Sequence, residues 1–232
     1  MDQPIYGRPA WLAQTNFWVI RTSVSSRECI IVDIPPEIGP MLDYLAEHDL
    51  KPVAIVATHG HIDHVGGIPA VAEQPAYLAP DGGQTLPVYA HPADHHMIAD
   101  PLGNGGMLRD ALVESGVSLR PPELLIGLED DESVKGAGLV MRALHTPGHT
   151  QGSICLATSI EGYPPLLFSG DHLFAGSIGR TDLPGGSYEQ LMESMVLKIL
   201  PLADETLVLP GHGQVTSVGQ ERLTNPFLAN LR

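Results

Sequence analysis

Short runs of consecutive apolar residues alternate along this chain with amphipathic segments, a pattern typical of an α/β protein. Runs at residues 17–20 and 29–32 flank a Ser-rich turn and predict an antiparallel hairpin. The run at 53–57 is rich in β-branched residues and predicts a buried strand. We expect further strands at 88–91, 139–144, 166–168 and 207–209, and helices near 38–45, 68–73 and 188–200.

Four of the predicted strands end abruptly in metal-ligand residue types, each set beside a glycine that allows close backbone approach. In layered α/β proteins, ligands collect at the carboxyl ends of strands, so we expect these side chains to meet. Imidazole nitrogens together with carboxylate oxygens suit zinc, iron or manganese. The residues concerned are His59, His61, Asp63, His64, His149, Asp171 and His212.

The densest of these clusters reads H-x-H-x-D-H over residues 59–64, and one such loop can serve two metal ions. Solvated loop histidines are the alternative, which this spacing directly after a buried strand disfavours. In contrast, His91, His95 and His96 have no matching cluster, so we interpret them as surface histidines.

Asp33 ends the run at 29–32. We favour a capping or structural role for it over a hydrogen bond to a metal-binding histidine. Residues 84–122 carry the weakest pattern, with one strand followed by helical turns between glycines, and they are a candidate wall of a substrate pocket.

Composition excludes several classes of protein. A formal net charge of −15 with only 12 Lys+Arg argues against nucleic-acid or anionic membrane surfaces. No apolar run approaches the roughly 20 residues of a membrane span, so we expect a cytoplasmic protein. Cys29 and Cys155 lie in apolar strands, where buried free thiols are expected.

The motifs THGHIDH, TPGHTQGS, SGDHLF and LPGHG, in this order, resemble the metallo-β-lactamase superfamily. Residues 176–186 resemble the short bacterial members related to hydroxyacylglutathione hydrolase, or glyoxalase II. The resemblance implies a four-layer αβ/βα sandwich of two mixed sheets with helices outside, formed by residues 1–232 as a single domain. The C-terminal helical glutathione-binding domain of classical glyoxalase II is not expected, because only a short segment follows His212. The thiol carrier therefore stays open.

By the same resemblance, His59, His61 and His149 hold one divalent metal ion, while Asp63, His64 and His212 hold the other. Asp171 bridges the two ions, with zinc expected and iron or manganese as alternatives. A hydroxide between the metals would attack an anionic thioester such as S-D-lactoylglutathione, with Asp63 and Asp171 as the catalytic carboxylates.

Other functions stay open from the sequence. A mononuclear-iron persulfide dioxygenase has the same H-x-H-x-D-H signature, and a metal-stabilised binding module needs no catalysis. We rank β-lactam hydrolysis lower. Arg180 is a candidate clamp for a substrate carboxylate or the partner of Asp182 in a salt bridge. Arg222 is the second candidate clamp, and the oligomeric state is not predicted.

Overall fold

The computed structural model describes residues 3–74, 77, 85–103 and 106–231. Its first sheet has the strand order β1-β2-β3-β4-β5-β6. The predicted hairpin is confirmed by the antiparallel pairing of β2 with β3, and β3 to β6 run parallel. The strands are β1 (Ile5–Ala10), β2 (Thr15–Ile20), β3 (Glu28–Val32), β4 (Lys51–Val56), β5 (Val88–Ala90) and β6 (Leu125–Gly127).

The second sheet has the order β14-β13-β10-β9-β8-β7 and is antiparallel except for the β10–β13 pair. Its strands are β7 (Ser133–Gly136), β8 (Leu139–His145), β9 (Ile154–Thr158), β10 (Leu166–Gly170), β13 (Leu207–Pro210) and β14 (Thr216–Ser217). A short hairpin, β11 (Leu173–Phe174) with β12 (Ser177–Ile178), follows β10.

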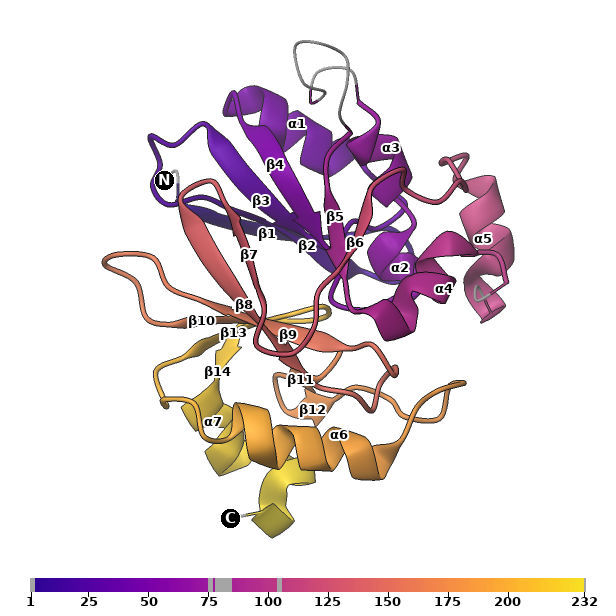
Figure 1. The fold of residues 1–232 in the computed structure, drawn as a ribbon. Coiled ribbons are helices and arrows are strands. Elements are labelled where there is room, and N and C mark those ends of the chain that lie inside the picture. Colours follow the sequence, from indigo (N-terminus) through magenta and orange to yellow (C-terminus); the bar gives the residue numbers. More distant parts are fainter. Residues whose placement is uncertain (1–2, 75–76, 78–84, 104–105, 232) are drawn as a thin grey trace.

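Helices cover the outer faces of both sheets, so the expected four-layer αβ/βα sandwich is confirmed (Figure 1). Helices α1 (Gly39–Glu47) and α3 (Ile68–Ala72) pack on the first sheet. Helix α6 (Tyr188–Ser194), which continues as a π-helical turn over Met195–Ile199, packs on the second together with α7 (Val218–Thr224). None of the helices in the described residues is long and apolar enough to cross a bilayer.

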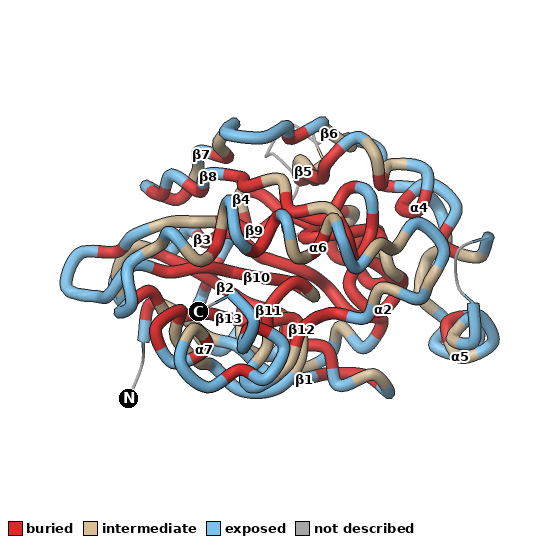
Figure 2. The backbone as a smooth tube through the Cα atoms, turned by 90° about the horizontal axis from the view of Figure 1, so that it is seen from below, coloured by how far each residue is buried: buried red, intermediate tan, exposed pale blue. Residues whose placement is uncertain are grey.

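The central strands are buried on both faces, which explains why their sequences are continuous apolar runs (Figure 2). In β2, Phe17 and Val19 point to the core beneath α1, while Trp18 and Ile20 point to the core between the sheets. The second sheet repeats this division, with Phe168 facing the first sheet and Leu167 facing α6. The two sheets are therefore held together by one shared apolar layer.

The weakly patterned region contains α4 (His95–Ala99) and α5 (Arg109–Glu114), joined through a 3₁₀ turn at Gly106–Leu108. Gln84, Asn104 and Gly105 lie outside the described residues. A short helix, α2 (Ile62–Val65), begins inside the histidine-rich loop after β4. These elements stand at the end of the sandwich where β4, β8, β10 and β13 terminate.

Candidate metal centre

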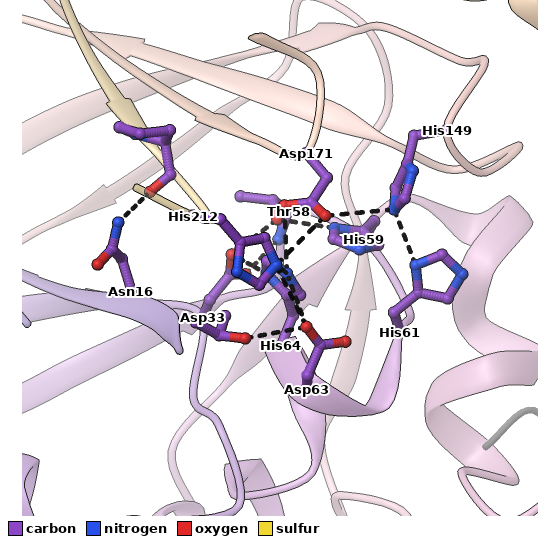
Figure 3. Close-up of polar contacts among 12 residues, drawn as sticks. Asn16, Asp33, Thr58, His59, His61, Asp63, His64, His149, Asp171 and His212 are labelled. Atoms are coloured by element: carbon purple, nitrogen blue, oxygen red, sulfur yellow. Dashed lines mark hydrogen bonds and ion pairs between the residues drawn. The ribbon is translucent and has the colours of Figure 1, made fainter. Parts of the chain in front are cut away.

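All seven predicted ligand residues meet at the seam between the two sheets (Figure 3). The loop after β4 and helix α2 supply four of them from the first sheet. The β8–β9 loop and the ends of β10 and β13 supply the other three from the second sheet. The first group is His59, His61, Asp63 and His64, and the second is His149, Asp171 and His212.

Three histidines form one compact group. His59, His61 and His149 offer ring nitrogens that all lie within 4.8 Å of one another. Nδ1 of His61 is 2.8 Å from Nε2 of His149. This spacing is that of neighbouring ligands around a single ion.

Asp63, His64 and His212 form a second group beside the first. Nε2 of His212 lies 3.3 Å from Oδ2 of Asp63 and 3.4 Å from Nε2 of His64. Asp171 stands between the groups, because its Oδ2 is 3.6 Å from Nε2 of His149 and 3.4 Å from Nε2 of His212. The geometry is thus two three-residue groups with one carboxylate between them.

Hydrogen bonds on the far side of three imidazoles fix which ring nitrogen faces the centre. Nδ1 of His64 lies 2.8 Å from Oδ2 of Asp33, and Nδ1 of His149 lies 2.8 Å from the carbonyl oxygen of Arg180. Nδ1 of His59 is 3.1 Å from the hydroxyl of Thr58, which itself donates to Asp33. With these protons on Nδ1, each Nε2 presents a lone pair, as a metal ligand requires.

The capping interpretation of Asp33 is wrong, because Ile38 stands at the N-cap of α1, and the alternative hydrogen bond to a histidine of the predicted ligand set is present. Its carboxylate is 1% exposed and accepts from the backbone N–H and the hydroxyl of Thr58, at 2.7 and 2.8 Å. The remaining contact is with His64, a ligand candidate 31 residues further along the chain. Asp33 thus orients one histidine directly and a second, His59, through Thr58.

Buried polar atoms without hydrogen bonds are a second indication that these residues suit metal ions. Nε2 of His59 is buried and makes no hydrogen bond with any described residue, and the buried Oδ1 of Asp171 likewise makes none, although it lies 3.3 Å from Nε2 of His64. Buried polar atoms are normally satisfied, and both atoms point into the space between the ligand groups (Figure 3). A divalent cation would satisfy the lone pairs of both.

The electrostatics separate the two groups. Burial lowers the pKa of His59 well below its usual value, and burial with the adjacent His149 lowers that of His61 to about 4. Burial also opposes charge on His64 and His212. However, the carboxylates of Asp171 and Asp63 raise the pKa of His64 well above its usual value and that of His212 to about 9. His59 and His61 are thus neutral at pH 7, whereas His64 and His212 bind protons.

Asp94 is a further buried acidic residue at the centre that the sequence pattern did not single out. It is 1% exposed and accepts hydrogen bonds from both histidine-bearing loops. His96, two residues further on, is exposed as predicted, and it lies at the pocket described below. His91 is instead buried and stacks on His145 with ring centroids 3.9 Å apart, so the surface interpretation was wrong for that residue.

A pocket of about 650 Å³ opens over the ligand groups. The predicted contribution of the region after β5 is confirmed, because Met97, Met107 and Leu108 line the pocket. Arg180 and residues 183–185 also line the pocket. Such an apolar wall beside a few convergent polar groups is typical of small-molecule sites.

The two candidate clamps differ. Arg180 lines the pocket, but its guanidinium makes a bidentate pair with Asp182 at 2.8 and 2.8 Å. Arg222 lies on α7, where it donates to the carbonyls of Leu200 and Leu202, and it is not among the described residues that line the pocket. The structure therefore gives Arg222 a structural role in place of the predicted substrate contact.

Comparison with known proteins places the chain among metal-dependent hydrolases, which agrees with a site of histidines and aspartates. Residues 10–212 match the family described as the Metallo-beta-lactamase superfamily. The chain is 39% identical to the probable metallo-hydrolase YqgX of Bacillus subtilis, covering 88% of this chain and 89% of that protein. It is 33% identical to the hydroxyacylglutathione hydrolase GloC of Haemophilus influenzae, covering 87% of this chain and 88% of GloC.

Two solved structures are similar over nearly the whole chain. The BLEG-1 B3 metallo-beta-lactamase has a TM-score of 0.81 and 35% identity, with 97% of this chain and 99% of that chain covered. TTHA1623 in a di-iron-bound form has a TM-score of 0.72 and 35% identity, with 96% and 100% covered.

Proposed function

Because the chain belongs to the metallo-β-lactamase superfamily, we propose that it is a hydrolase that uses two divalent metal ions to cleave an anionic thioester such as S-D-lactoylglutathione. We propose that residues 1–232 do so as a single domain. The observation that carries this proposal is the pair of three-residue ligand groups joined by Asp171. The similarity to GloC supports the substrate class, and the similarity to TTHA1623 in a di-iron-bound form supports two ions.

One ion would be held by His59, His61 and His149, and the other by Asp63, His64 and His212, with Asp171 as the shared ligand. Zinc, iron and manganese all suit imidazole and carboxylate donors, and zinc is the expected ion. When bound, the two ions would lower the pKa of a coordinated water and polarise a carbonyl oxygen of the substrate.

The protein's own residues position the reaction. Thr15 donates a 2.9 Å hydrogen bond to Oδ2 of Asp63, which fixes that carboxylate beside His212. Asp63 and Asp171 both line the pocket, so either can accept the proton of the attacking water. Attack at the thioester carbon breaks the C–S bond and yields a carboxylate and a thiol.

A protein thiol does not act as the nucleophile in this proposal. Cys29 lies in the core beneath α1 and Cys155 in the core beneath α6. Burial raises the pKa of both thiols to about 12, and neither lines the pocket. Water is therefore the attacking group.

The proposal is tested by assaying purified, metal-loaded protein with S-D-lactoylglutathione and with the D-lactoyl thioester of an uncharged thiol. We expect thioester hydrolysis that is lost on chelation and restored by zinc. The ratio of kcat/KM for the two substrates measures the contribution of the carrier. Absence of hydrolysis of both thioesters by protein holding two ions would reject the proposal.

Two other activities can be followed with the same preparation. The similarity to the BLEG-1 B3 metallo-beta-lactamase makes β-lactam hydrolysis the second candidate, to be tested with a chromogenic cephalosporin. Persulfide dioxygenase activity predicts one iron per chain and oxygen uptake with glutathione persulfide. A binding module would hold metal without turning over any of these substrates.

A further inference from the structure

We propose that Asp94 is a positioning residue that sets the metal affinity of the three-histidine group, although it lies on neither of the loops that carry these histidines. The inference rests on the proposed metal site and is independent of the substrate. Its basis is the convergence of three hydrogen bonds from two separate loops on one buried carboxylate.

Asp94 is the last residue of a 3₁₀ turn, Pro92–Asp94, that follows β5. Its Oδ2 accepts from the backbone N–H of Gly60 at 2.8 Å and from the hydroxyl of Thr150 at 2.7 Å. Its Oδ1 accepts from the backbone N–H of Gly152 at 2.8 Å. Both carboxylate oxygens are thus committed to the loops, and the side chain is 1% exposed.

The donors are direct neighbours of the ligands. Gly60 lies between His59 and His61, and Thr150 directly follows His149. The first loop leaves β4 in one sheet and the second joins β8 to β9 in the other. Asp94 therefore fixes the position of His149 relative to the other two histidines across the seam.

The approach of both loops to this segment is too close for a side chain at either glycine. A Cβ on Gly152 would lie 2.6 Å from Cγ and 2.7 Å from the backbone nitrogen of Asp94. A Cβ on Gly60 would lie 2.6 Å from Cβ of Met97 in the adjoining helix α4. The two glycines allow the loops to approach this segment closely, and the carboxylate of Asp94 then keeps them there through its hydrogen bonds.

Substitution of Asp94 by asparagine disrupts these hydrogen bonds to the two loops with little change in side-chain volume. The amide has one acceptor oxygen, and its NH₂ group must face either Gly60 or Gly152. In both orientations a backbone N–H meets another donor, and a buried donor is left unsatisfied. We expect the two loops to move apart and the three histidines to lose their common geometry.

The test is a competition titration of metal-free protein with zinc and a chromophoric chelator. For Asp94→Asn we expect the affinity of the three-histidine group to fall by about 10- to 100-fold, as for other partners of ligands. A double-mutant cycle locates the effect. In a His212→Ala background, which disables the other group, the fall should persist, whereas in a His149→Ala background it should disappear.

Glu221→Gln is the matched control. Glu221 is 2% exposed and its carboxylate accepts from Gly176, Thr216 and Asn225, so it resembles Asp94 in burial and in number of donors. It should lower the melting temperature as Asp94→Asn does, with unchanged zinc affinity. This control separates a loss of general stability from a loss of metal geometry.

Two results would overturn the proposal. One is wild-type zinc affinity in Asp94→Asn, with or without a lower melting temperature. The other is an equal loss of affinity in the His149→Ala background. Because the titration measures binding, absence of thioesterase activity in the wild type would reject the proposed function and leave this inference standing.

Discussion

Asp171 is the side chain on which both ligand groups converge, and it is 12% exposed at the pocket floor. Asp171→Ala should lower kcat/KM for thioester hydrolysis by at least about 100-fold, since it removes a shared ligand and not only a supporting partner. The fold should persist because the polar contacts of this carboxylate among the described residues are with the side chains of His64, His149 and His212 and not with the main chain. Asp182→Ala, in the segment after β12, is the control. Full activity with two ions in the Asp171 variant would exclude the shared-ligand role.

Arg180 is a residue whose charge is already compensated. Its bidentate pair with Asp182 makes the pocket rim neutral there, while its carbonyl oxygen, which any side chain leaves in place, orients His149. Arg180→Ala should therefore change KM by less than about twofold, because an exposed ion pair contributes little. Steady-state kinetics decide this, and a large rise in KM at constant kcat would show that the guanidinium binds substrate.

The candidate ligand residues could be predicted, because each set of them follows an apolar strand and contains or adjoins a glycine. The residues that support them could not. Asp33 lies 31 positions from His64, and Asp94 lies 34 and 58 positions from Gly60 and Gly152. Such pairs have no local pattern, and only the folded chain brings a carboxylate to its distant donors.

The candidate metal centre is built at the ends of strands. The glycines there determine how closely the strand ends approach one another. A Cβ on Gly211, just after β13, would lie 2.5 Å from Cε1 of His64 and would also contact Oδ1 of Asp171. Gly211→Ala should displace these ligands and lower metal content. Gly39→Ala, at the start of α1 where nothing lies within 4 Å of a Cβ, is the matched control. Elemental analysis showing equal metal in both variants would contradict this prediction.

Most strands with buried apolar runs were predictable, whereas β1 and the short buried helix α2 were not. The apolar runs of β2, β3, β4, β8, β10 and β13 correspond to predicted strands. In contrast, β1 was not predicted, since its central residues are exposed and its place depends on antiparallel pairing with β2. The predicted helix at 188–200 is present, but its π-helical end at Met195–Ile199 has no signature in the periodicity.

Metal binding to this protein should be coupled to the release of protons. Without metal, the pKa of His64 is raised well above its usual value and that of His212 to about 9, because Asp171 and Asp63 outweigh the effect of burial. Both histidines should carry protons at pH 7 and release them when zinc binds, so zinc affinity should rise as the pH increases through about 9. Calorimetry in buffers of different ionisation enthalpy measures this release. Identical heats in all buffers would contradict it.

At this scale the four-layer architecture was predictable mainly through the resemblance carried by the four motifs. Hydrophobic pattern alone predicts an α/β protein and leaves the pairing of strands open. The alternation of Trp18 and Ile20 with Phe17 and Val19 assigns each to its core only once the second sheet is in place. The metal centre thus depends on the packing of two sheets whose ligands come from both.

Zinc titration of metal-free protein, with the rate of S-D-lactoylglutathione hydrolysis as the readout, tests the dinuclear hydrolase most directly. Two ligand groups joined by Asp171 predict that activity rises until two equivalents of zinc are bound and then stays constant. Full activity at one equivalent would contradict the need for the second ion. No hydrolysis at two bound equivalents would contradict the thioester reaction itself.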